Sequence, residues 1–394
     1  MPKPPALRPV VLAGLLSLAA AMGIGRFAFT PLLPLMLREG GLDLALAGWL
    51  AAANYAGYLA GALTAARLPL GARSLALLAL VATALLTAAM AVSSLPLWLL
   101  LRFGAGVSSA WVFVATSVWC LGALARRGRG DLAGWVYAGV GIGIALTGLY
   151  CAGAARLASS MLWVQLGVLV LVLTLPVAWV LARTTTDTAA SSAVAAVPAL
   201  AQGEVRGLIA CYGLMGFGYI LPATFLPAMA RSVVADPRVF GLAWPVFGAT
   251  AAVSTVLAGW LLRRATRLQV WAASQLAMGV GVLLPGLWRN GWTIAASALL
   301  VGGTFMVITL AGVQELRARA PAQAARLVAR MTAAFALGQI AGPVLSALLL
   351  QVPALRERGL ALALQSGAAG LLLSAVWLWR LATRTDLSTE TAHA

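Results

Sequence analysis

Two arginines lie within long apolar stretches of the sequence, where a positive charge needs a physical reason. Arg26 follows two glycines, and Arg102 lies in a separate stretch further along the chain. An arginine near the centre of a bilayer costs about 2.5–3.5 kcal/mol even on translocon insertion scales. A water-filled cavity would reduce that cost, and an anion between the two guanidinium groups would relieve their repulsion. The alternative for Arg26 is a bond to helix carbonyls that Pro31 or Pro34 leaves free.

A second polar group stands in the middle of another apolar stretch and consists of Asn54, Tyr55 and Tyr58. Asn54 and Tyr58 are four positions apart, so a helix presents both on one face. Tyrosines of membrane proteins normally gather near the two interfaces. This placement therefore favours either a pore lining or buried hydrogen bonds between helices. The predicted substrate-binding set is Arg26, Arg102, Asn54, Tyr58, Tyr137 and Tyr219.

Other chemistries lack the residues they need. The only lysine is Lys3 and the only histidine is His393, so a P-loop, a histidine-based triad and a histidine metal site are excluded. No acidic residue lies deep in an apolar stretch, and Glu315 is the one carboxylate near a membrane edge that could couple transport to protons. Alternatively, Glu315 belongs to a charge cluster with Arg317 and Arg319 at the cytoplasmic end of its helix. We predict no catalytic residues, no cofactor and no metal.

The elements that must position these residues are membrane helices. Hydrophobic residues make up 62% of the 394-residue chain and charged residues only 9%, unlike a soluble domain. A helix needs about 20 apolar residues to cross a bilayer. Continuous apolar runs predict an all-α integral membrane protein with twelve transmembrane helices. Their approximate ranges are 9–37, 44–66, 74–94, 95–121, 131–153, 161–182, 205–231, 240–262, 269–288, 292–314, 328–350 and 360–380.

A short apolar pattern occurs twice, at an offset of 193 positions. The residues of the first copy are Met22, Gly23, Gly25, Pro34 and Met36, and those of the second are Met215, Gly216, Gly218, Pro227 and Met229. Parallel repeats of this kind occur in secondary transporters, with the substrate between them. We therefore predict a six-helix bundle over 1–182, a cytoplasmic linker over 183–204, and a second six-helix bundle with a tail over 205–394.

The basic residues lie mostly in the loops between the predicted helices and do not cluster on one exposed face of the protein. With a cytoplasmic N-terminus, eighteen lysines and arginines lie on the inside and seven arginines on the outside. The positive-inside rule then places both termini in the cytoplasm. The net charge of +17 therefore reflects membrane topology and does not predict nucleic-acid binding.

Glycines and prolines mark expected close contacts and bends. Small residues four apart let helix backbones approach each other, and proline bends a helix. Helix packing is enough to explain such residues. In a transporter whose two bundles rock against each other, the same packed surfaces also open and close the substrate path. The predicted gating or packing residues are Gly23, Gly25, Pro31, Pro34, Gly139, Gly143, Gly338 and Gly342.

Residues 23–36, Gly-Ile-Gly-Arg-Phe-Ala-Phe-Thr-Pro-Leu-Leu-Pro-Leu-Met, resemble the first-helix signature of the YbfB/YjiJ family of the major facilitator superfamily. Arg102 to Gly106 resembles the fourth-helix pattern whose arginine is linked to proton coupling in some members. The resemblance implies the major facilitator fold, a central cavity between the two bundles, alternating access, and a monomer.

We therefore expect a secondary active transporter of the bacterial inner membrane, proton- or ion-linked, that moves a small anionic solute or one with an anionic group. Its partners would be that solute, the lipid bilayer and a coupling proton, without nucleic acid. The first alternative is a multidrug or metabolite efflux antiporter with an aromatic cavity. The remote alternative is a membrane-embedded enzyme or a receptor.

Overall fold

The computed structural model describes residues 7–65, 67–92, 94–129, 132–183, 202–236, 240–319 and 324–393, and over these ranges every regular element is a helix. The first half of the chain contains α1 (Leu7–Leu18), the π-helix η1 (Ala19–Arg26), α2 (Phe29–Arg38), α3 (Leu44–Thr64), α4 (Ala72–Ala89), α5 (Leu95–Ala125), α6 (Ala133–Gly153) and α7 (Ser159–Arg183). The second half contains α8 (Gln202–Val233), α10 (Ala243–Leu261), α11 (Arg267–Leu287), α12 (Gly291–Arg319), α13 (Ala324–Gln351), the short η4 (Pro353–Leu355) and α14 (Gly359–His393).

These helices agree with the twelve predicted spans. Among the described residues eleven helical segments are long and apolar enough to cross a membrane, and the first combines α1, η1 and α2 into one segment from Leu7 to Arg38. α3, with 21 residues, is the twelfth long helix, and it carries Asn54, Tyr55 and Tyr58 near its middle. The third and fourth spans are separate, because α4 ends at Ala89 and α5 begins at Leu95. Most of the expected linker, residues 184–201, lies outside the described residues.

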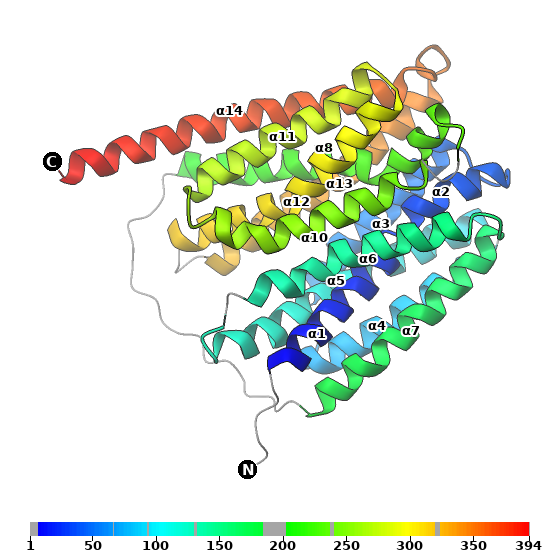
Figure 1. The fold of residues 1–394 in the computed structure, drawn as a ribbon, viewed down its shortest axis with the longest axis horizontal. Coiled ribbons are helices and arrows are strands. Elements are labelled where there is room, and N and C mark those ends of the chain that lie inside the picture. The colour runs from blue at the N-terminus through cyan, green and yellow to red at the C-terminus, as the bar shows by residue number, and fades with distance from the viewer. Residues whose placement is uncertain are drawn as a thin grey trace.

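The two halves meet through equivalent helices. Contacts between them are made mainly by α3 with α13, by α6 with α10, and by α2 with α8. α3 and α10 are the second membrane helices of their halves, and α6 and α13 are the fifth. Each of the two main contacts therefore joins a second helix to a fifth, as expected for two copies of one unit. Figure 1 shows α7 and α14, the last helices of each half, at opposite edges of the molecule.

The molecule has two ends along the helix direction. α1 begins and α14 ends on the same side, which we call the terminal end (left in Figure 1). The opposite side, called the far end, carries the turns after α2, α6 and α8. α2 packs against α8, whereas α1 packs within its own half on α5, α6 and α7. The first membrane helix thus contacts the other half chiefly through its far-end portion.

Candidate functional site

The first membrane helix changes its hydrogen-bonding pattern at Arg26. The Phe27 amide donates to the Met22 carbonyl five residues back, whereas the Thr30 amide donates to the Phe27 carbonyl three residues back. In an α-helix, Thr30 would donate to the carbonyl of Arg26. Pro31 has no amide hydrogen and cannot continue the ladder. The local break therefore releases the Arg26 carbonyl for a partner outside the helix.

Arg102 takes up that carbonyl. Its Nη2 donates to the Arg26 oxygen at 3.2 Å, and its guanidinium lies 4.9 Å from the centre of the Phe29 ring. The backbone of α5 is held in turn by Asn54, whose Nδ2 donates to the Arg102 carbonyl at 2.9 Å. Arg102 is 2% exposed. The structure therefore connects three predicted site residues in a single chain of hydrogen bonds within the first half.

The Arg26 side chain reaches across to the second half. Its Nη2 donates to Gln339 Oε1 at 2.6 Å, and the guanidinium carbon lies 3.8 Å from the centre of the Tyr58 ring and 5.3 Å from that of Tyr55. Arg26 is 2% exposed, and its Nε has no hydrogen-bond partner in the described part of the chain. Such contacts with ring faces stabilise a desolvated cation. They leave the charge without a carboxylate, since no ion pair found among the described residues involves Arg26 or Arg102.

Gln339 and Tyr219 form the facing surface of the second half. Gln339 Nε2 donates to the Tyr219 hydroxyl at 2.6 Å, so one buried amide joins Arg26 to Tyr219. The Tyr219 ring stacks between Phe305, at 5.5 Å, and Phe335, at 5.6 Å. Stacked neighbours fix the ring and therefore aim the hydroxyl. Tyr219 occupies the repeat position of Arg26, and α8 continues through it unbroken.

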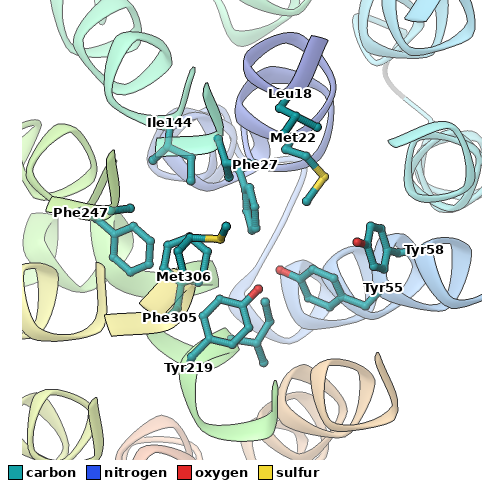
Figure 2. Close-up of a cluster of buried hydrophobic side chains, with 14 of the residues drawn as sticks. Leu18, Met22, Phe27, Tyr55, Tyr58, Ile144, Tyr219, Phe247, Phe305 and Met306 are labelled. Carbon is teal, nitrogen blue, oxygen red and sulfur yellow. The ribbon is translucent and has the colours of Figure 1, made fainter. Parts of the chain in front are cut away.

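Apolar and aromatic side chains from both halves surround this chain of polar groups. Figure 2 shows them converging on one central place, with the Tyr55 and Tyr219 hydroxyls directed inward. Tyr55 also bonds across the halves, its hydroxyl lying 3.1 Å from the Thr224 hydroxyl. We call this set the central cluster. Its labelled members are Leu18, Met22, Phe27, Tyr55, Tyr58, Ile144, Tyr219, Phe247, Phe305 and Met306.

Two further predicted residues lie elsewhere. The Tyr137 hydroxyl pairs with the Ser117 hydroxyl at 3.1 Å, and its ring packs on Phe113, so both of these contacts are with α5 in its own half. Glu315 lies at the terminal end of α12. Its carboxylate pairs with Arg267 at 3.1 Å and with Arg319. This arrangement matches the alternative that Glu315 belongs to a charge cluster.

Most of the predicted glycines pack within one half. A Cβ built on Gly23 would overlap the backbone of Gly143, so the first membrane helix and α6 touch through bare backbone. Gly139 approaches Leu15 in the same pair of helices. Gly338 and Gly342 approach α8 in the equivalent pair of the second half, whereas Gly25 faces the Thr83 side chain. Pro31 and Pro34 lie beyond the break, and the Pro34 carbonyl accepts a hydrogen bond from Arg231 of the second half.

Several residues important to this geometry were outside the predicted set. Gln339 joins the halves, Tyr55 faces Arg26, and Gly141 and Gly248 meet where α6 crosses α10. An amide in the middle of the apolar run of α13 was a usable signal for Gln339, because such a side chain needs a buried partner. The two glycines carry no such signal, since the helix faces that meet depend on the rotation of each helix.

Comparisons with known proteins agree with this architecture. A family profile described as "Uncharacterised MFS-type transporter YbfB" matches residues 18–378. No curated protein matches the sequence. Similar solved structures include a point mutant of the nucleoside transporter NupG, with a TM-score of 0.70, 14% identity, and coverage of 94% of this chain and 99% of that one.

Two more solved structures have the same fold. A D-xylose–proton symporter has a TM-score of 0.69 and 15% identity, covering 95% of this chain and 96% of that one. The human organic anion transporter MFSD10 (TETRAN) has a TM-score of 0.64 and 18% identity, covering 95% of this chain and 100% of that one. At these identities the likeness concerns the fold alone.

Proposed function

The chain belongs to the YbfB family of MFS-type transporters. From that membership we propose that it moves a small organic anion across the bacterial inner membrane by alternating access. The family and the similar structures are membrane transporters, which supports transport by this chain rather than catalysis. The anionic substrate is our own inference. It rests on one observation, the buried Arg26 guanidinium, which donates to the neutral amide of Gln339 and forms no ion pair with a carboxylate in the described part of the chain.

Among the described residues, the Arg26 guanidinium has no carboxylate partner, and a substrate carboxylate could fill that role. Charge-assisted hydrogen bonds are about twice as strong as neutral ones, so a substrate carboxylate would displace Gln339 Oε1 from Arg26. The Gln339 amide hydrogens and the Tyr219 hydroxyl could then donate to the same solute. A bound anion would contact both halves at once. A solute shifts the populations of two conformations only when it binds them with different affinities.

The proposed orientation places the terminal end in the cytoplasm. This follows from the eighteen basic residues assigned to the inside against seven outside. We also propose that the protein acts as a monomer, as the resemblance to the major facilitator superfamily implies. A proton is the proposed coupling ion, and Glu315 remains the candidate coupling acid, since protonation would release Arg267 and Arg319 at the cytoplasmic end.

The test uses purified protein in proteoliposomes, with a panel of labelled mono- and dicarboxylates and matched amides. We expect anion uptake by the unmodified chain, loss of that uptake in Arg26→Gln, and partial retention in Arg26→Lys, which keeps the charge. Gel filtration and thermal unfolding of each variant establish that it is folded. Equal uptake of anions by the unmodified chain and Arg26→Gln would refute an anion site at this arginine.

A second candidate function is the efflux of amphipathic drugs. It is favoured by the continuous aromatic series in the second half, in which Trp244 stacks on Phe247, Phe247 on Phe305, and Phe305 on Tyr219. Aromatic surfaces accommodate many apolar ligands with little directional demand. The two functions differ in their dependence on charge. Transport of a lipophilic cation that survives Arg26→Gln but fails in Phe305→Ala would favour efflux.

A further inference from the structure

A concave region lies at the far end, between the halves and separate from the hydrogen bonds of Arg26. It is a pocket of about 780 Å³, lined by α2, by the end of α6 and the turn after it, by the end of α8 with residues 234–236, and by residues 240–244 at the start of α10. This volume falls within the roughly 300–1,000 Å³ of ordinary small-molecule sites. We call it the far-end pocket. The residues that carry the argument are Pro34, Arg38, Arg156, Arg231, Asp236 and Trp244.

Positive charge is concentrated in this pocket. Arg38, Arg156 and Arg231 all line it, although only seven arginines were assigned to the outside of the membrane. Asp236 lines it too, so the cationic groups outnumber the acidic one. Arg38 donates to the Ala155 carbonyl at 3.3 Å, and Arg231 donates to the Pro34 carbonyl. A guanidinium has five N–H donors, so these bonds hold both side chains in place and leave donors for a ligand.

A buried donor on the pocket wall supplies independent support. Trp244 lines the pocket, is 1% exposed, and its Nε1 has no hydrogen-bond partner in the described part of the chain. The Nε1 atom itself is shielded, so a ligand reaches this N–H only if the indole turns toward the pocket, and an acceptor there would recover the roughly 1–3 kcal/mol that a buried N–H without a partner costs. The indole also stacks on Phe247 at 4.9 Å and lies 6.1 Å from Phe27. Trp244 is therefore the wall between the pocket and the central cluster.

We infer that the far-end pocket is a second binding site, which takes small organic dianions such as dicarboxylates before they reach the central cluster or after they leave it. Three guanidinium groups on three separate segments match a ligand with two separated carboxylates, since guanidinium recognises carboxylate through paired donors. This site rests on the proposed function for its role in transport. Its occupancy by a dianion can be measured without any transport.

The experiment uses the full chain with Ala235→Cys, a substitution at an exposed residue that lines the pocket. The native cysteines 120, 151 and 211 are buried, and Cys151 also lines the pocket, so the unsubstituted chain, labelled with and without succinate, gives the background. The label is N-ethylmaleimide, which is uncharged, and the probe is succinate, compared with sodium chloride at equal ionic strength. We expect succinate to slow the labelling of the introduced cysteine, whereas chloride does not.

Substitutions of pocket residues test whether succinate protects the cysteine by binding in this pocket. Arg156→Gln should require roughly tenfold more succinate for half protection, as expected for one lost charge-assisted hydrogen bond. Trp244→Phe keeps the ring and removes the N–H, so it should also weaken protection. Arg26→Gln should leave protection unchanged while it abolishes uptake, which separates this site from the proposed transport site.

Three results would overturn the inference. They are a labelling rate that succinate does not change, protection that Arg38→Gln combined with Arg156→Gln leaves intact, and protection that disappears in Arg26→Gln. Failure of anion uptake by the unmodified chain would instead refute the proposed function, and protection of the cysteine would still be measurable.

Discussion

Arg102 and Arg26 are joined through backbone rather than through their charges, because Arg102 Nη2 donates to the Arg26 carbonyl at 3.2 Å. The bond exists only because the first membrane helix abandons its regular ladder next to Pro31. Arg102 thus supports the segment that aims the Arg26 guanidinium at Gln339 and Tyr58. We regard Arg102 as a positioning residue for Arg26, and the prediction of a shared anion between the two remains to be tested.

Arg102→Met should loosen the break in the first helix. Methionine retains an unbranched apolar side chain and loses the donor, so the Arg26 carbonyl is left without its partner. We expect the amides of Phe27 to Thr30 to exchange hydrogen roughly tenfold faster, which corresponds to one charged hydrogen bond of about 1.5 kcal/mol. Hydrogen-exchange mass spectrometry measures this directly. Arg102→Lys keeps a charged donor and is the matched control; equal exchange in all three proteins would exclude the positioning role.

Gln339→Glu should lock the two halves together. The introduced carboxylate would face the Arg26 guanidinium at the position of the present 2.6 Å bond and form a buried ion pair. We expect a higher unfolding temperature and slower anion uptake, because the ion pair competes with the substrate. Gln339→Leu removes the competitor and the cross-half bond, so it should lower the unfolding temperature. A variant that carries the carboxylate and transports normally would contradict the assignment of Arg26 to the substrate.

Two glycines on α6 should respond differently to alanine. Gly143 packs on η1 within the first half, so Gly143→Ala should cost about 1–3 kcal/mol of stability through overpacking. Gly141 packs on Ala252 of the second half, so Gly141→Ala should disfavour this arrangement of the halves and reduce transport. Thermal unfolding and uptake together distinguish the two effects. Gly259→Ala on α10 is the control, because a Cβ there meets nothing within 4 Å; identical behaviour of all three would refute this division.

Glu315→Gln tests the proposed coupling. The substitution removes the ion pairs with Arg267 and Arg319 at the terminal end of α11 and α12. Arg267 is 42% exposed and remains solvated, so we expect a stability loss of only about 1 kcal/mol. Uptake driven by a proton gradient should fail, whereas exchange of labelled for unlabelled solute should continue. Accumulation that still follows the proton gradient would show that Glu315 has a structural role only.

The positions of the membrane helices along the chain were predictable from the sequence, because each span is a continuous apolar run. The predicted spans 44–66 and 131–153 agree with Leu44–Thr64 and Ala133–Gly153 to within two residues. The family prediction also holds, since the YbfB profile matches residues 18–378. Arg26 stood out in the sequence because of its charge within an apolar run, and the structure shows it 2% exposed with Gln339 as its hydrogen-bond partner; its predicted role in a substrate cavity stays a prediction.

The partners of that charge could not be predicted in the same way. Gln339 lies 313 positions from Arg26, and which helix faces meet depends on packing over the whole molecule. The π-helical segment from Ala19 to Arg26 is also invisible in hydropathy, because its hydrogen bonds differ from those of an α-helix while its composition does not. The bend was expected from Pro31 and Pro34, but its consequence for Arg102 was not.

The far-end contact of the first membrane helix with the second half is held by few hydrogen bonds. Two hydrogen bonds tie that portion to the second half, one from the Thr30 hydroxyl to the Ala223 carbonyl at 2.7 Å and one from Arg231 to the Pro34 carbonyl. Together such bonds are worth about 2–4 kcal/mol, an interval in which a minor conformer is still populated. Thermal fluctuation is therefore sufficient to part these two bonds, so under the proposed alternating access most of the resistance to movement lies in the packing of α3 on α13 and of α6 on α10.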